Sequence, residues 1–215
     1  MVMVMGVTGS GKSAFVNLLK PVAERAEQRF PSDPKSPPQA VKLAFDRRPR
    51  RSITVIELET PGFNGTQPAG ATALKEVLRY LSIQYALEIP LKGIIYFHSI
   101  DTPLTPQSAA YNYLEMFISV CNGPESLENV IFVTTGWDKI PEQDNMDAEE
   151  IGMQREQDLM DTWLGPILKR GATVMRFHGL SAEAQAMMIR LASNDEVLVL
   201  DVQKKLVDNG KSISD

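Results

Sequence analysis

The sequence predicts an α/β protein of three layers, in which a mainly parallel six-stranded sheet carries helices on both faces. Short apolar runs with strand character alternate along the chain with longer stretches whose apolar residues recur at helical spacing. The first apolar run leads directly into the glycine-rich segment Gly6 to Ser13 (GVTGSGKS), which matches the phosphate-binding pattern G-x-x-x-x-G-K-[ST]. Because strands that alternate with helices favour parallel pairing, these observations indicate a three-layer phosphate-loop NTPase fold.

Each element follows from its own pattern. The expected strands are Val2 to Met5, Ala40 to Asp46, Ser52 to Leu58, Lys92 to His98, Asn129 to Thr134 and Thr173 to Phe177. The expected helices are Lys12 to Arg29, Ala71 to Ala86, Pro106 to Cys121, most of Asp147 to Leu168, Ser181 to Ala192 and an amphipathic helix at about 196–208. Four prolines exclude regular structure from FPSDPKSPPQ, and the basic turn RRPRR after Asp46 predicts an antiparallel hairpin.

Composition limits the classes of protein to consider. The 215 residues suffice for one large domain, so we expect a single unit over residues 1–215. The net charge of -5 argues against a nucleic-acid surface, and no apolar run approaches the roughly 20 residues of a membrane span. The lone Cys121 excludes an intrachain disulfide and fits a reducing, cytoplasmic location. MVMVM lacks a basic lead, so we expect no signal peptide, and we expect a domain excised close to its first strand.

The phosphate-binding loop carries the clearest chemistry. Glycines allow successive backbone N–H groups to point at phosphate oxygens near the positive end of the following helix. Lys12 is expected on the β- and γ-phosphates, and the Ser13 hydroxyl is expected to bind Mg²⁺. A chance match is the alternative, but the position between a strand and a helix argues against it. The residues expected to contact the phosphates are Thr8, Gly9, Ser10, Gly11, Lys12, Ser13 and Ala14.

Further segments resemble guanine-nucleotide motifs. VIELETPGF looks like the third GTPase motif (usually DTPGF), and VIFVTTGWD looks like the fourth, base-reading motif [NT]KxD. Together with KGIIYFHSID and LVDNGKSISD, the chain resembles the septin/Toc/GIMAP-like (AIG-type) GTPases over essentially its whole length, and most closely the fungal G domain-containing proteins of that group. The resemblance implies a Ras-like G domain that binds GTP or GDP with Mg²⁺.

The resemblance also implies a base site. Asp138 matches the Asp that accepts hydrogen bonds from guanine N1–H and its exocyclic amine, so a buried carboxylate there favours GTP over ATP; alternatively Asp138 only caps a loop. Thr135 belongs to the same motif. Gly136 replaces a Lys that usually lies along the base, and Trp137 is expected to supply an apolar wall. The fifth motif lies in FHGLSA, with His178 and Gly179, or Ser181 and Ala182, near the base.

The chain departs from the resemblance where catalysis is expected. Glu59 replaces the Asp that holds Mg²⁺ through a water, and Gly62 is the expected partner of a γ-phosphate oxygen. Phe63 follows, so the water-positioning Gln of Ras-type enzymes is absent. The expected catalytic set is therefore Lys12, Ser13, Glu59 and Gly62, with Ser13 and Glu59 at the metal.

The switch segment departs as well. No Thr occurs between Thr8 and Thr54, which leaves Ser32 and Ser36 as the only hydroxyls of the proline-rich loop. We therefore expect nucleotide binding without efficient intrinsic hydrolysis, and Glu59→Asp is expected to raise turnover.

Other conspicuous residues have ordinary explanations. Arg47, Arg48, Arg50 and Arg51 form a basic turn that is either a solvated hairpin tip, which we favour, or a phosphate-binding arginine cluster. His98 is expected to be a satisfied structural histidine, and Cys121 a packed apolar residue. Trp163 and the Met187-Met188 pair are expected in the core.

Three functions remain open on the sequence. The first is a cytoplasmic guanine-nucleotide-binding GTPase whose hydrolysis is slow or depends on a nucleotide-dependent homodimer. The second is a nucleotide-gated scaffold without useful turnover. The third is an ATP-using small-molecule kinase, which the TPG segment and the Asp138 motif disfavour. The sequence names no protein partner and predicts neither a nucleic-acid partner nor a transmembrane segment.

Overall fold

The computed structural model describes residues 1–20, 39–44, 52–57, 69–101, 104–106, 108–142 and 146–209. Its strands form one six-stranded sheet with the spatial order β2-β3-β1-β4-β5-β6. The strands are β1 (Val2–Gly6), β2 (Gln39–Ala44), β3 (Ser52–Glu57), β4 (Gly93–Ser99), β5 (Val130–Thr135) and β6 (Thr173–Arg176). All six expected strands are confirmed to within two residues at each end.

The sheet is parallel apart from one edge strand. β1 pairs in parallel with β3 on one side and with β4 on the other, and β5 and β6 continue the parallel series. β2 pairs antiparallel with β3, which confirms the predicted hairpin, while its basic turn lies outside the described residues. The predicted mainly parallel architecture is therefore confirmed.

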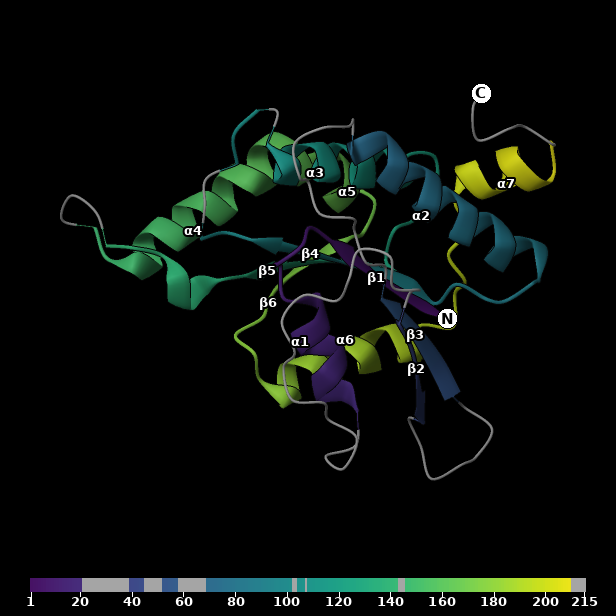
Figure 1. Ribbon diagram of the computed structural model, residues 1–215, viewed down its shortest axis with the longest axis horizontal. Coiled ribbons are helices and arrows are strands. Elements are labelled where there is room, and N and C mark those ends of the chain that lie inside the picture. The colour runs from purple at the N-terminus through teal and green to yellow at the C-terminus, as the bar shows by residue number, and fades with distance from the viewer. Residues whose placement is uncertain are drawn as a thin grey trace.

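Helices cover both faces of this sheet (Figure 1). Helices α1 and α6 lie on one face, below the sheet in the figure, and the other helices lie on the opposite face. The helix bounds are α1 (Lys12–Leu19), α2 (Ala69–Ala86), α3 (Ala109–Val120), α4 (Ala148–Leu159), α5 (Gly165–Leu168), α6 (Ser181–Ser193) and α7 (Asp201–Val207).

Alternation along the central strands builds two cores. In β1, Val2 and Val4 pack into the core beneath α1 and α6, together with Phe15 and Met188. The intervening residues, such as Met3, join the larger core on the other face. Successive strand side chains point to opposite faces, so strands covered on both sides have to be apolar throughout. The expected core position of the Met187-Met188 pair is confirmed, since both are fully buried.

Three expected helices are shorter than predicted. The helix expected at Pro106 to Cys121 is α3, Ala109–Val120, which Ser108 caps. α1 was expected to continue to Arg29, but it ends at Leu19 and Lys20 is extended. Lys20 precedes Pro21, and a residue before proline avoids the helical region. Residues 21–29 lie outside the described part. The last helix begins at Asp201 rather than near residue 196, because the preceding segment is extended and the Leu198 amide donates to Leu91 O.

The long helical stretch at Asp147 to Leu168 is confirmed with an internal irregularity. Asp147 caps α4 by accepting a hydrogen bond from the Glu150 amide over 2.8 Å. Residues Met160–Leu164 then form a π-helical turn before α5.

Cys121 is fully buried, as expected, and burial raises the pKa of its thiol to about 12. None of the helices that the structure describes has the length and apolar character that a membrane crossing needs.

Candidate functional site

The expected site residues that the structure describes gather at one edge of the sheet, where the parallel strands β1, β3, β4, β5 and β6 end. In open α/β sheets, ligands bind in the crevice beyond these carboxyl ends. The phosphate-binding loop follows β1, the TGWD segment follows β5, and the His178-Gly179 loop follows β6. The topology therefore brings the phosphate loop together with two segments that lie more than a hundred residues further along the chain.

The phosphate loop begins at a glycine that the sheet requires. Gly6 has a φ of +140°, and a Cβ there would lie 2.2 Å from the carbonyl oxygen of Phe97 in β4. Beyond it, Gly9 and Gly11 also have positive φ values. The Ser10 amide donates to Val7 O over 3.1 Å, so the loop turns back on itself before α1 begins. Thr8 and Gly9 are exposed at the tip, whereas Ser10 is buried.

Lys12 and Ser13 open helix α1, as the motif requires. Lys12 is only 4% exposed, and its Nζ donates to Val7 O over 3.0 Å within the loop. The Ser13 Oγ donates to Glu57 Oε1 over 2.6 Å, and Ala14 follows half-buried. Glu57 was not among the residues expected from the sequence. Its only signal there is a charged residue in the strand run SITVIEL, which has no other charged residue.

The TGWD segment, which resembles the base-reading motif, is joined directly to the phosphate loop. Thr135, the last residue of β5, donates from Oγ1 to Ser10 O over 2.9 Å. Thr135 is buried, so this contact is protected from water. The structure therefore places the fourth-motif residue Thr135 against the phosphate loop, although 125 positions separate them in the chain.

Gly136 explains one departure from the GTPase pattern. Its φ is +74°, a left-handed conformation, and a Cβ there would lie 2.4 Å from Ser99 Oγ. The Ser99 hydroxyl itself donates to Asp101 Oδ1 over 2.9 Å, so it occupies a defined position. A lysine at this position is incompatible with the neighbouring end of β4 as it is folded here.

Trp137 and Asp138 lie in a single 3₁₀ turn, Trp137–Lys139. The indole is held from several sides. Its Nε1 donates to Thr134 O over 3.3 Å, and Arg176 stacks with its guanidinium carbon 4.2 Å from the ring centroid. A Cβ on Gly152 of α4 would collide with the ring. The ordered, half-buried indole suits the expected apolar wall, which stays a prediction.

Asp138 differs from expectation in its environment, because the residue is exposed rather than buried. The turn that carries it lies beyond the end of β5. The N-cap position of the turn belongs to Gly136, and the alternative that Asp138 caps a loop stays a prediction.

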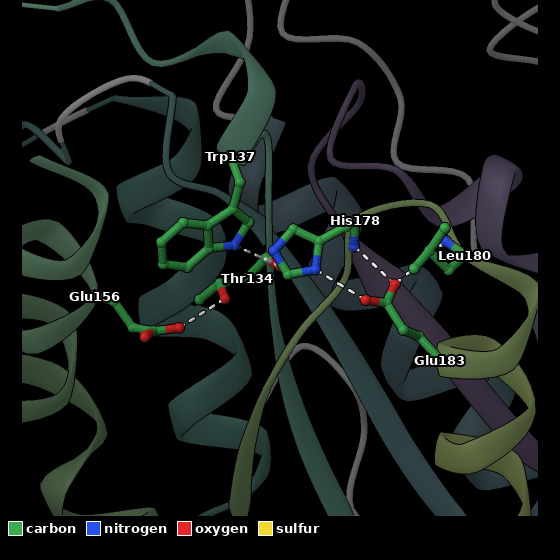
Figure 2. A network of polar contacts seen from close by, with 6 residues as sticks. All are labelled: Thr134, Trp137, Glu156, His178, Leu180 and Glu183. Atoms are coloured by element: carbon green, nitrogen blue, oxygen red, sulfur yellow. Dashed lines mark hydrogen bonds and ion pairs between the residues drawn. The ribbon is translucent and has the colours of Figure 1, made fainter. Parts of the chain in front are cut away.

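An ion pair between the buried Glu156 and the partly exposed Arg176 lies beside the TGWD segment, and Figure 2 shows Glu156 with its other partner, Thr134. Glu156 of α4 is 6% exposed and accepts from Thr134 Oγ1 over 2.8 Å. Its other oxygen accepts from Arg176 Nε and Nη2 over 2.9 and 2.6 Å. Arg176 thereby joins β6 and α4 while it stacks on Trp137. Sequence reasoning missed this network, since three isolated polar residues in different elements carry no local pattern.

The fifth-motif segment forms the wall beside Trp137. Figure 2 shows the His178 ring next to the indole, with 6.0 Å between ring centroids. Glu183 accepts from the His178 and Leu180 amides over 2.8 and 3.2 Å and contacts His178 Nδ1 at 2.8 Å. Burial raises the pKa of the Glu183 carboxyl, but these hydrogen bonds outweigh burial and lower it. His178 and Gly179 are exposed in the loop, whereas Ser181 begins α6.

The predicted catalytic residues Glu59 and Gly62 lie outside the described residues, so their roles stay predictions. The same holds for the proline-rich segment at 30–38, for Phe63 and for the basic turn. Within the described ranges, no group of three or more His, Cys, Asp or Glu side chains is arranged to hold a metal ion. Magnesium at nucleotide sites usually needs only one or two protein oxygens besides phosphates and waters.

His98 corrects a further expectation. It is 2% exposed, as predicted for a structural residue, but its Nδ1 has no hydrogen-bond partner among the described residues. Burial lowers the pKa of its imidazole to about 4, against an opposing effect of Asp101. A cavity of about 340 Å³ lies beside it, between β4, α4 and the π-helical turn. Trp163, expected in the core, is half-buried, lines this cavity and packs edge-on against Tyr111.

No protein-family model and no curated protein sequence matches this chain. Solved structures with a similar fold include the following two. One is a dimerization-deficient mutant of Toc33 from Arabidopsis thaliana, with a TM-score of 0.63 and 14% identity over 91% of this chain and 85% of that one. The other concerns the chloroplast translocon components atToc33 and psToc159, with a TM-score of 0.60 and 16% identity over 92% of this chain and 85% of that one. At such identities the likeness shows the fold alone, that of phosphate-loop G domains.

Proposed function

We propose that this chain is a guanine-nucleotide-binding phosphate-loop GTPase domain of the septin/Toc/GIMAP-like type, with slow or dimerisation-dependent hydrolysis. The observation that carries the proposal is the hydrogen bond from Thr135 Oγ1 to Ser10 O. A phosphate loop alone is common to ATP and GTP proteins. Here it is tied to a segment, TGWD, that resembles the guanine-reading motif, so one ligand can touch both.

Different residues contact the phosphates and the base of the nucleotide. The phosphates lie on the loop amides and on Lys12, whose ammonium is already buried within the loop and exchanges Val7 O for phosphate oxygens. The base lies beside Trp137 and His178, with Asp138 accepting from the two N–H donors of guanine. Adenine lacks that pair of donors, so an exposed carboxylate at this position favours guanine.

The described residues fit Mg²⁺, which prefers hard oxygen ligands. The Ser13 hydroxyl is the expected protein ligand, and the Glu57 carboxylate lies 2.6 Å from it. When bound, the ion neutralises charge on the phosphates. The chain's own contribution is to orient Ser13 and to hold Lys12 in the loop.

Slow hydrolysis follows from what the sequence lacks, namely a water-positioning Gln and a switch threonine. We propose that a second copy of the chain is needed for faster hydrolysis. For atToc33 and psToc159, dimerization is important for GTPase activity, and this chain shares their fold. A dimer-dependent enzyme turns over faster per molecule as protein concentration rises, whereas a scaffold without turnover does not.

Two measurements test the proposal. Calorimetric titration of the purified, nucleotide-free chain with GDP, GTP and ATP should show guanine nucleotides binding at least tenfold more tightly than ATP, and Lys12→Ala should abolish that binding. Equal affinity for ATP would support a kinase instead. Hydrolysis per molecule, measured over a hundredfold range of protein concentration, should rise in parallel with the dimer fraction from light scattering. If light scattering shows only a monomer at every protein concentration in the presence of a GTP analogue, the proposed dimer is contradicted.

A further inference from the structure

Four residues at the TGWD segment form a closed cycle of contacts. Arg176, the last residue of β6, donates from Nε and Nη2 to Glu156 Oε2 over 2.9 and 2.6 Å. Glu156 accepts at its other oxygen from Thr134 Oγ1 over 2.8 Å. The Thr134 carbonyl accepts from Trp137 Nε1, and the guanidinium of Arg176 lies over the indole, 4.2 Å from the ring centroid. Figure 2 shows the two contacts that Thr134 makes in this cycle.

Two strands, a helix and a turn bring the cycle together. Thr134 and Arg176 are paired in register between β5 and β6, so their side chains lie on the same face of the sheet. Glu156 reaches this face from α4, and only 8% of its side chain is exposed. Gly152, one turn earlier in α4, allows the indole of Trp137 to approach the helix, because a Cβ there would lie 2.8 Å from the ring. The indole is therefore held along one edge, over one ring face and against α4.

The contacts with Glu156 restrict the plane of the guanidinium as well as its position. Two donors on one edge of the Arg176 guanidinium share a single carboxylate oxygen. Hydrogen bonds between two charged groups are strong, and a planar guanidinium can stack on an aromatic face. Arg176 therefore presents its flat face to Trp137 in one orientation. A lysine would carry the same charge on a compact ammonium, which has no flat face to stack.

The order of this indole matters for a base that binds beside it. Trp137 is the largest side chain of the TGWD segment, and Gly136 before it has none. The indole is half-buried, so part of its surface stays open to a ligand. Binding that immobilises a mobile side chain costs conformational entropy, whereas a ring that is already ordered avoids this cost. An ordered Trp137 therefore binds a flat base more tightly than a mobile one.

We propose that Arg176 is a positioning residue of the base site: bound to Glu156, it holds the Trp137 indole in the orientation that the guanine base contacts. The inference rests on the proposed function, because it concerns the base of a bound guanine nucleotide. It goes beyond that function by assigning the order of the indole to an ion pair between β6 and α4, outside the TGWD segment. In the alternative, the ion pair only fastens β6 to α4 and has no bearing on the ligand.

The test compares the affinity for GDP with the affinity for inorganic tripolyphosphate, which has no base. Calorimetric titration of the full, nucleotide-free chain measures both. Arg176→Ala should weaken GDP binding by about three- to thirtyfold, the range of a cation–π contact from exposed to desolvated sites, and leave tripolyphosphate binding unchanged. Arg190→Ala is the matched control, because Arg190 donates to Thr173 Oγ1 at the start of the same strand. It should match wild type for both ligands.

The fluorescence of Trp137 reports the order of the indole directly. The chain has two tryptophans, so Trp163→Phe leaves Trp137 as the only one. In that background, Arg176→Ala should enlarge the fast component of the time-resolved anisotropy of the free protein. Arg176→Lys keeps the charge without the flat guanidinium. It should therefore recover stability against urea relative to Arg176→Ala, while the fast anisotropy component stays large and the affinity for GDP stays low.

A double-mutant comparison separates positioning from fastening. If Arg176 acts through the indole, Arg176→Ala should weaken GDP binding much less in a Trp137→Ala background than in wild type. An affinity for GDP that Arg176→Ala leaves unchanged, or weakens equally in both backgrounds, overturns the inference. If Arg176→Ala fails to fold, Arg176→Lys and its coupling to Trp137→Ala decide the matter. If the wild type binds no guanine nucleotide, the proposed function fails first and the inference falls with it.

Discussion

The hydroxyl of Thr135 at the end of β5 donates to the carbonyl oxygen of Ser10 in the phosphate loop, over 2.9 Å and out of contact with solvent. One side chain thus joins the segment assigned to the base with the loop assigned to the phosphates. Because Ser10 is fully buried, water cannot replace this donor when it is removed.

Thr135→Val should therefore weaken both the fold and the ligand site. The change keeps the shape and leaves Ser10 O without its donor, so we expect the free energy of unfolding to fall by about 1–3 kcal/mol. GDP should also be released faster than from wild type, because the loop that holds the phosphates loses this hydrogen bond. Urea denaturation and fluorescent-GDP release measure the two effects. Ser82→Ala, which removes a hydroxyl bonded to Leu78 O within α2, is the control for release and should leave it unchanged.

Gly136→Ala should destabilise the protein although it only adds a methyl group. The left-handed conformation costs about 1–2 kcal/mol for a residue with a Cβ, and the new atom meets Ser99 Oγ at 2.4 Å. We expect a total loss of about 1–3 kcal/mol in the free energy of unfolding. Adding Ser99→Ala should recover the part that is due to the collision and leave the conformational part. A stability equal to that of wild type for Gly136→Ala would show that a side chain fits here after all.

The sequence allowed the layers of the fold to be predicted, because apolar periodicity reports burial locally. The same reasoning located the two phosphate-loop residues Lys12 and Ser13, whose spacing is itself the motif. It missed Glu57, since the meaning of that residue depends on a contact 44 positions away. It also missed Glu156 and Arg176, which become partners only when α4 and β6 are packed together.

His98 should make stability fall as the solution becomes acidic. Burial lowers the pKa of its imidazole from 6.5 to about 4, so between these values the unfolded chain binds a proton that the folded chain does not. The stability contributed by the neutral ring is complete above pH 6.5 and is lost as the pH falls through about 4, by up to about 3 kcal/mol. His98→Phe, beside Phe132, should flatten this dependence in denaturation experiments from pH 7 to pH 4. A slope for His98→Phe equal to that of wild type would be contrary to the prediction.

Asp138→Asn should change which base the protein prefers. The exposed carboxylate of Asp138, on the turn that follows Thr135, is the proposed acceptor for guanine N1–H and the exocyclic amine. Hydrogen bonds to charged groups contribute about 1.5–3 kcal/mol each, so affinity for GDP should fall at least tenfold. Xanthine carries an oxygen in place of that amine and needs a donor, which the Asn amide supplies, so affinity for xanthosine diphosphate should rise. Calorimetry with both nucleotides measures the exchange, and Asp195→Asn, an exposed change near the opposite edge of the sheet, should leave both affinities as in wild type. If Asp138→Asn leaves the affinity for GDP unchanged, the base is recognised by other residues, and Trp137 and His178 are the next to test.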